Sequence, residues 1–371
     1  MTISNIFMSI TKHKKNNTRK HTTVTILFIF LILAIILIVD QNLKFKHIQY
    51  INSYAENEYI EYTDKVEFLA FSTLIAFPEK AFTKNNSNEY ENTKLTINEF
   101  KNILEQLYLN DYIIVDIEDI YKYENNRITK QKLFLPKNKK PIVLTFNNVA
   151  YKSSYQNIGE IDKIIIDRNN ELASYTTKKS IQDRVQYDNE FILILENYLT
   201  KHPDFHLGNA KGIIFCTGEN GILGYNTCHN YASSKNELKR VTALINKMKK
   251  MGWKFGSNNY RYLSQKEMSE LEFAKDISLW NNEIKPAIKN TNLFAYPYGE
   301  YDENKTRLEI LLCNEFNIFF VNNNYVVDNN YRDYVIIPQI YINSDTLKNK
   351  EETIKHLFNP ETVYDANSRI I

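Results

Sequence analysis

The histidines and cysteines of this 371-residue chain give little support for a metal or nucleophile site. His202 and His206 are four residues apart, a spacing that can pair two imidazoles on a helix, but Pro203 disfavours a continuous helix there. Cys228 and His229 are adjacent, and neighbouring side chains rarely face each other productively. We therefore interpret the histidines as ordinary loop or surface residues and assign no nucleophile role to Cys228.

Two further groups of reactive residue types have a structural interpretation. Asp116, Glu118 and Asp119 follow the β-rich run Tyr112–Val115, and acidic residues in this position are typical of a solvated loop or the start of a helix. The three cysteines are odd in number and lack zinc-type spacing, so at most one disulfide is possible. We predict that they are buried free thiols; they are Cys216, Cys228 and Cys313.

The elements that would position any site begin after a hydrophobic segment. Thr22–Val39 has 18 residues without a charge, enough for a helix to cross a bilayer core of about 30 Å. Five basic residues precede this segment and Asp40 follows it, which predicts a cytoplasmic N-terminus. A cleavable signal peptide is the alternative, although no small-x-small cleavage site precedes Asp40. The prediction is a single-pass protein of the cell membrane whose globular part lies outside.

Length and composition are typical of one large outer domain, and its charge argues against nucleic acid as a partner. Beyond the anchor, 41 of the 46 Lys and Arg remain against 44 Asp and Glu, a formal charge near −3. We divide the chain into a cytoplasmic basic segment, a transmembrane anchor, a stalk and one domain, with the boundaries 1–21, 22–39, 40–65 and 66–371.

Strand and helix patterns alternate along the domain. The predicted strands are Val66–Phe71, Tyr112–Val115, Pro141–Phe146, Ile213–Thr217, Trp253–Gly256, Leu293–Ala295, Ile318–Val321 and Val335–Ile337. The predicted helices include Thr96–Leu109, Asn189–Thr200 and Lys235–Met251, and Lys163–Tyr175 reads as a hairpin. Such alternation predicts an α/β fold with parallel strands, either a barrel or an open sheet, whose site lies at the carboxyl ends of the strands.

Three segments at such strand ends carry a family resemblance. They are Leu144-Thr145-Phe146-Asn147-Asn148, then Gly252-Trp253 through Ser257-Asn258-Asn259-Tyr260-Arg261-Tyr262, and Phe294-Ala295-Tyr296-Pro297-Tyr298-Gly299. Together they resemble the signature motifs of the polysaccharide deacetylases, the NodB homology domain, over about residues 66–347. The segment from Ala210 to Tyr225 is similar to a membrane-anchored clostridial branch of that family.

The resemblance implies a distorted seven-stranded (β/α) barrel and a metal-dependent hydrolase of N-acetyl groups in which an Asp and two His hold a divalent metal such as zinc. Here the metal positions carry Asn148, Asn258 and Tyr262, and the general-base position carries Asn147. An amide cannot accept a proton near neutral pH, and neutral amide oxygens are poor zinc ligands. The catalytic motifs are therefore degenerate, and we expect no bound metal cofactor.

The groove that the resemblance implies is better preserved. Pro297, Tyr298 and Gly299 match the family segment that lines the substrate groove, although a plain turn is an equal alternative. Gln339 stands where the family has an Arg, and Asn343 where it has a following Asp.

These observations lead to one main hypothesis and two others. The main one is a catalytically inactive, membrane-anchored deacetylase-like domain that binds cell-wall glycan or an envelope protein. The alternative is an active metal-dependent deacetylase of polysaccharide or peptidoglycan with an atypical site. A third is a purely structural module that presents the stalk.

Overall fold

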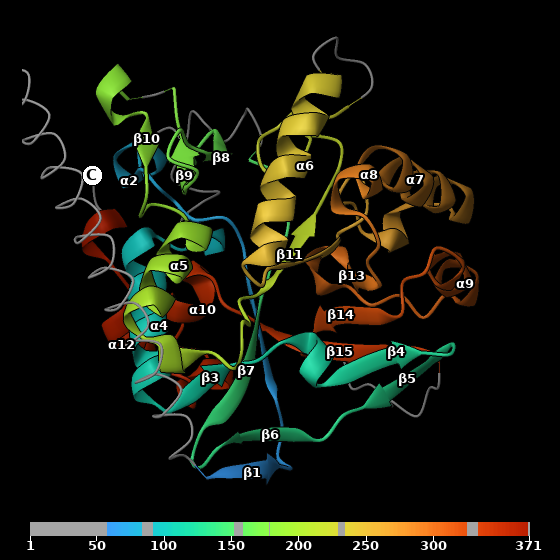
Figure 1. Ribbon diagram of the computed structural model, residues 1–371, viewed down its shortest axis with the longest axis horizontal. Helices are drawn as coiled ribbons and strands as arrows, with labels where there is room; N and C mark the ends of the chain where they lie inside the picture. The colour runs from blue at the N-terminus through green and yellow to red at the C-terminus, as the bar shows by residue number, and fades with distance from the viewer. Residues whose placement is uncertain are drawn as a thin grey trace, which may run out of the picture. The chain divides into compact units, whose positions relative to one another are not determined.

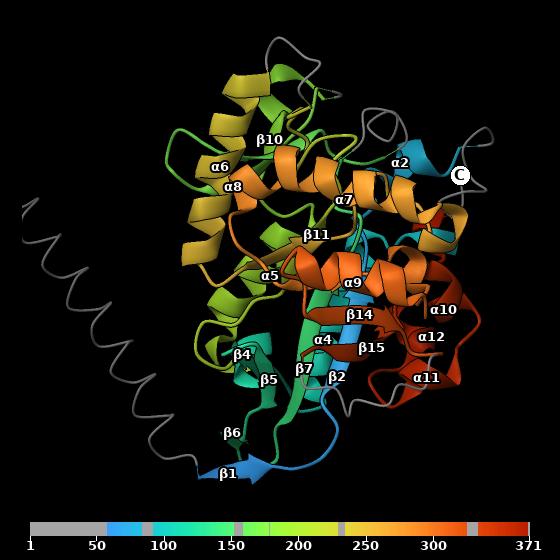
Figure 2. The same cartoon turned by 90° about the vertical axis from the view of Figure 1, so that its right-hand side faces the viewer.

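The chain folds around a parallel sheet of eight strands (Figures 1 and 2). The computed structural model describes residues 58–83, 92–151, 159–177, 179–228, 234–324 and 333–369. Residues 59–371 form one compact unit. Its parallel strands are β2 (Glu67–Phe71), β3 (Tyr112–Ile114), β7 (Lys140–Phe146), β11 (Ile213–Cys216), β12 (Lys254–Ser257), β13 (Leu293–Ala295), β14 (Ile318–Asn322) and β15 (Val335–Tyr341).

Seven of these strands close into a barrel. The order is β11-β12-β13-β14-β15-β2-β7, and β7 pairs with β11 to complete the ring. The first residues of β7 pair with β3, from Lys140 to Ile142, whereas Thr145 and Phe146 pair with β11. Strand β3 therefore extends the sheet outside the ring, and the predicted seven-stranded (β/α) barrel is confirmed.

Helices cover the outside of the barrel (Figures 1 and 2). They are α2 (Pro78–Ala81), α4 (Ile97–Leu109), α5 (Phe191–Lys201), α6 (Ser234–Lys250), α7 (Glu270–Glu283), α8 (Lys285–Ile288), α9 (Lys305–Cys313), α10 (Ser344–Lys348), α11 (Glu352–Lys355) and α12 (Pro360–Val363). Short 3₁₀ turns are η1 (Ile117–Asp119), η3 (Ile181–Asp183), η4 (Pro203–Phe205), η5 (Gln265–Glu267), η6 (Pro297–Gly299) and η7 (Asn367–Arg369). The three helices predicted from periodicity are α4, α5 and α6, within two residues at each end.

Side-chain alternation along the strands divides the core into two layers. Phe215 and Phe320 extend into the barrel from strands that are not neighbours, and their ring centroids are 5.1 Å apart. The residues next to them, including Ile214 and Phe319, belong instead to the larger cluster that packs under the helices. Both faces of the barrel strands are thus buried, which explains their continuous apolar runs.

Three small antiparallel sheets are added to the barrel. They pair β1 (Tyr59–Tyr62) with β6 (Leu133–Pro136), β4 (Tyr121–Glu124) with β5 (Arg127–Lys130), and β8 (Lys163–Ile166) with β9 (Leu172–Tyr175) and β10 (Val185–Gln186). The β8–β9 pairing confirms the predicted hairpin, and the Asp167 side chain accepts hydrogen bonds from the backbone N–H groups of Asn169 and Glu171 in its turn. Strand β1 lies within the range predicted as a stalk.

The predicted transmembrane anchor, Thr22–Val39, lies outside the described residues. Among the helices that the structure describes, none is both long and apolar enough to cross a membrane.

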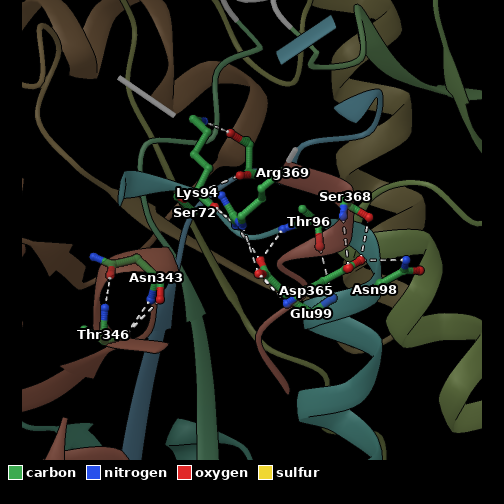
Figure 3. A network of polar contacts seen from close by, with 11 residues as sticks. Ser72, Lys94, Thr96, Asn98, Glu99, Asn343, Thr346, Asp365, Ser368 and Arg369 are labelled. Carbon is green, nitrogen blue, oxygen red and sulfur yellow. Dashed lines mark hydrogen bonds and ion pairs between the residues drawn. The ribbon is translucent and has the colours of Figure 1, made fainter. Parts of the chain in front are cut away.

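A buried ion pair fastens the C-terminal segment to the start of α4 (Figure 3). Thr96 caps α4 in a capping box with Glu99, whose carboxylate is fully buried. The Arg369 guanidinium donates to both carboxylate oxygens of Glu99, at 3.1 and 2.6 Å, and to the carbonyl oxygen of Lys94 at 2.9 Å. The Arg369 group also lies 4.9 Å from the centre of the Phe82 ring. The pair therefore fixes the backbone of Lys94.

Replacing Arg369 with Met should lower the free energy of unfolding by about 3–5 kcal/mol, because the change leaves the Glu99 carboxylate buried without its cation. The measurement is urea unfolding of the full chain. The control is Lys350→Met, which removes an exposed pair with Glu361 and should cost less than about 1 kcal/mol. Equal losses in the two variants would contradict the structural role of Arg369.

Candidate functional site

A cleft of about 670 Å³ opens where the carboxyl ends of the barrel strands meet. Five of the residues named from the sequence line it: Asn147, Asn148, Tyr262, Tyr298 and Asn343. The other predicted residues, Asn258, Pro297, Gly299 and Gln339, are buried. The structure therefore brings the three resembling segments together at one end of the barrel, where the sequence predicted a site.

Asn258 forms a cross-link between two strand ends. Its Oδ1 accepts a hydrogen bond from the backbone N–H of Asn148 at 2.8 Å, and its Nδ2 donates to the carbonyl oxygen of Ala295 at 2.8 Å. The side chain is fully buried. Both ends of the amide are thus engaged in joining the loop after β7 to the end of β13.

Asn147 and Asn148 complete strand β7 and turn the chain. The backbone N–H of Asn147 donates to the carbonyl oxygen of Phe71 at 2.8 Å, and its Nδ2 lies 3.5 Å from Oε1 of Gln339. Asn148 has φ of 54°, a left-handed conformation that Asn tolerates better than most residues. The Oδ1 atoms of both residues are buried and have no hydrogen-bond partner among the described residues.

Two tyrosines form an aromatic pair at the mouth of the cleft. The ring centroids of Tyr262 and Tyr298 are 4.8 Å apart at an interplanar angle of 54°. The backbone N–H of Tyr298 lies 3.4 Å from the Tyr262 hydroxyl oxygen, a weak hydrogen bond. Tyr298 is 55% exposed. Partial burial, followed by the nearby carboxylates of Glu267 and Glu300, raises the pKa of Tyr298.

Gly299 is required by the tight turn that carries Tyr298. Its φ is 69°, and a Cβ atom there would lie 2.8 Å from both the backbone nitrogen and the Cβ of Asn322. Its N–H donates to the carbonyl oxygen of Tyr296 at 2.8 Å within η6. Tyr298 itself has φ of 58°, so the segment is a tight turn with a left-handed residue at its centre, and its exposed tyrosine ring borders the cleft.

Three charged residues of the cleft wall were not predicted from the sequence: Lys94, Glu219 and Arg261. Lys94 forms an ion pair with the buried Glu160, and Arg261 donates from Nε to Oδ1 of the buried Asp276 at 2.7 Å. Glu219 follows β11 closely, so its place after a buried strand was a usable signal. Lys94 comes from the segment before α4, and only the tertiary structure brings it to the cleft.

The metal that the family resemblance implies does not fit this donor set. The three ligand positions offer two amides and a phenol, and both ends of the Asn258 amide are already hydrogen-bonded. Among the residues that the structure describes, no group of three His, Cys, Asp or Glu side chains is placed to hold a metal ion. A zinc-like ion favours thiolate, imidazole or carboxylate ligands, so this arrangement does not reproduce such a centre.

His202 has a packing role. Its ring contacts those of Tyr108 and Tyr198, with centroid distances of 4.5 and 4.4 Å. Burial is the first cause that lowers the pKa of His206, to about 4, so this imidazole is neutral at pH 7. His229 lies outside the described residues.

The acidic cluster and the cysteines also have structural roles. Asp116 caps the short turn η1 by accepting from the backbone N–H of Glu118, in line with a helix start. All three cysteines are free thiols, and two of them, Cys216 and Cys228, are buried as predicted. The prediction of burial was wrong for Cys313, which is exposed at the end of α9. This helix covers the barrel with few buried residues, so its last position faces solvent.

Comparison with known proteins supports the resemblance over part of the chain. Residues 205–311 match the family model described as Polysaccharide deacetylase. The match includes the segments of Tyr262 and Tyr298 but not that of Asn147. The polysaccharide deacetylase resemblance is therefore confirmed at this level. No curated protein matches the chain.

Three solved structures were compared with the chain. The Streptococcus pyogenes deacetylase PplD in complex with acetate is 13% identical, with TM-score 0.43, and the match covers 79% of this chain and 100% of that one. IcaB from Ammonifex degensii is 16% identical, with TM-score 0.42 and coverages of 76% and 94%. BA3943 from Bacillus anthracis, described as a CE4 family pseudoenzyme, is 17% identical, with TM-score 0.25 and coverages of 46% and 56%.

A buried carboxyl group lies behind the cleft wall. Glu190 is fully buried, and its Oε1 accepts from the backbone N–H groups of Leu74 and Phe191 at 3.2 and 2.9 Å. Burial is the first cause that raises the pKa of Glu190, to about 8, and the charge of Glu160 adds to it while Lys94 opposes it. Glu190 is therefore protonated at pH 7.

This burial predicts a specific dependence of stability on pH. Because the folded pKa exceeds the unfolded one, the unfolded chain loses the Glu190 proton first, and stability falls between about pH 5 and pH 8. In the Glu190→Gln variant, the free energy of unfolding should fall less steeply with pH, by up to about 1.4 kcal/mol per pH unit. Urea unfolding of both proteins across this range measures the difference. An unchanged slope would show that Glu190 does not titrate in this way.

Proposed function

We propose that this chain is a non-catalytic polysaccharide deacetylase-like protein that binds cell-wall glycan through the cleft at the carboxyl ends of its barrel strands. The observation that carries the proposal is the hydrogen-bonded amide of Asn258, which stands at a metal-ligand position of the family that the chain resembles. A cleft is present beside it. An envelope protein as the ligand is the other outcome to be tested.

The chemistry of the substituted positions supports the loss of catalysis. Asn147 has no proton-accepting form near neutral pH, so it cannot remove a proton from an attacking water. With two amides and a phenol, the three ligand positions supply no carboxylate, thiolate or imidazole to a divalent metal.

The shape of the cleft supports binding. Its volume of about 670 Å³ is within the usual range for small-molecule sites. Tyr298 presents an exposed ring, and an aromatic face packs well against the apolar face of a pyranose. A purely structural module has no need of such a cleft.

One observation keeps the catalytic alternative open to test. Glu219 lines the same cleft, so its carboxylate is the candidate for a substitute base in an atypical N-acetyl deacetylase. The two proposals differ in whether acetate is released.

We expect the full chain, purified in detergent, to cosediment with peptidoglycan, to contain no stoichiometric divalent metal and to release no acetate from acetylated chito-oligosaccharides. The Tyr298→Ala variant should weaken sedimentation by about tenfold, because a stacking face is lost. The matched control is Tyr123→Ala, which removes an exposed tyrosine from the β4–β5 hairpin.

Metal together with acetate release would reject the non-catalytic proposal and favour the atypical hydrolase. Loss of acetate release in Glu219→Gln would then identify the base. Absence of peptidoglycan binding would reject the glycan proposal and favour a protein ligand.

We further propose that Thr22–Val39 anchors the chain in the cell membrane, with residues 1–21 in the cytoplasm and residues 66–371 outside. Protease added to spheroplasts should digest the domain, and the chain should remain in the membrane pellet at high pH. Deleting residues 22–39 should abolish pelleting. A shorter mature chain that begins near residue 40 would favour the signal-peptide alternative.

A further inference from the structure

The charges that line the cleft are not equally compensated. Lys94 forms an ion pair with Glu160, and Arg261 forms one with Asp276, whose carboxylate is fully buried. Glu219 also lines the cleft but takes part in no ion pair among the residues that the structure describes. The charges of Lys94 and Arg261 are thus neutralised by buried carboxylates. Among the described residues that line the cleft, Glu219 is the one charged side chain without an oppositely charged partner.

The unpartnered hydrogen-bonding atoms of the residues that line the cleft include two amide oxygens and the hydroxyl of Tyr341. Asn147 is only 3% exposed and its Nδ2 is directed to Gln339, whereas its Oδ1 has no partner among the described residues. The Oδ1 of Asn148, which also lines the cleft, is buried and likewise without a partner in the described part of the chain. A ligand that satisfies these oxygens must bring hydrogen-bond donors.

Two carboxylates lie near the exposed ring of Tyr298. Burial is the first cause that raises the pKa of Tyr298, and the charges of Glu267 and Glu300 add to it. Glu300 is held in place by a hydrogen bond from the hydroxyl of Ser264. An exposed tyrosine ring near carboxylates attracts cations through the ring face as well as through the charges.

We propose that the cleft selects the protonated amino group of a deacetylated amino sugar over the N-acetylated form. This inference rests on the proposed glycan binding and specifies its ligand. An ammonium group brings three donors and a positive charge to Glu219 and to the oxygens of Asn147 and Asn148. An acetamide brings only one N–H donor and no charge, so it satisfies fewer of these oxygens and leaves the Glu219 carboxylate without a cation. The cleft would therefore recognise polysaccharide that has already lost acetyl groups.

The test is calorimetric titration of the full chain in detergent with two chito-oligosaccharides of equal length, one fully N-acetylated and one fully deacetylated. At about pH 6 the deacetylated ligand should bind at least about tenfold more tightly, since a charge-assisted hydrogen bond contributes on this scale. The preference should decline as the pH rises and the amine loses its proton.

Two variants of equal charge change separate recognition from general attraction. Glu219→Gln should weaken binding of the deacetylated ligand by about tenfold and leave the acetylated ligand unaffected. Glu171→Gln, at the exposed turn between β8 and β9, should change neither affinity.

The outcomes distinguish this inference from the proposed function. Equal or tighter binding of the acetylated ligand would overturn the amine preference and leave glycan binding intact. The inference would also be overturned if Glu219→Gln bound the deacetylated ligand as tightly as the unaltered chain. The same holds if Glu171→Gln weakened this binding as much as Glu219→Gln does. Binding of neither oligosaccharide would reject both proposals.

Discussion

The pairing of β7 with both β2 and β11 is the constraint on which the rest of the structure depends. It converts an open parallel sheet into a closed ring, and closure brings the carboxyl ends of all seven strands to one mouth. Asn148 and Asn258 are 110 residues apart in sequence, yet the backbone of one donates to the side chain of the other across this mouth. Had the sheet stayed open, the predicted site residues would be spread along an edge.

A neutral amide is well suited to the buried position of Asn258 at the mouth of the closed barrel. Asn258 is fully buried, and both ends of its amide are hydrogen-bonded. A carboxylate or imidazolium at the same place would carry a charge into a dry environment and would need a counter-charge, whereas a satisfied amide does not. The strand ends after β7, β12 and β13 are thus held together by hydrogen bonds between uncharged groups.

Local patterns predicted most of the elements and the residue types of the site. The periodicity of α4 is contained in one short segment, and the apolar run of β7 reflects burial on both faces. Strand β1 was not predicted, because its four residues are largely exposed and acquire their conformation by pairing with β6. Lys94 was missed for a similar reason, since Arg369 fixes its backbone from the far end of the chain.

The sequence by itself determined the chemistry that the strand ends can perform, because an Asn has no basic or anionic form near pH 7 whatever surrounds it. It also determined the alternation of strands and helices, since burial on two faces or one leaves a local pattern. Only the tertiary structure decided that the two cleft cations are neutralised by buried carboxylates, and that Glu219 and Asn147 line one cleft. These features depend on contacts between residues that are far apart in the sequence. A local sequence pattern does not show which charged side chains will pair through such contacts.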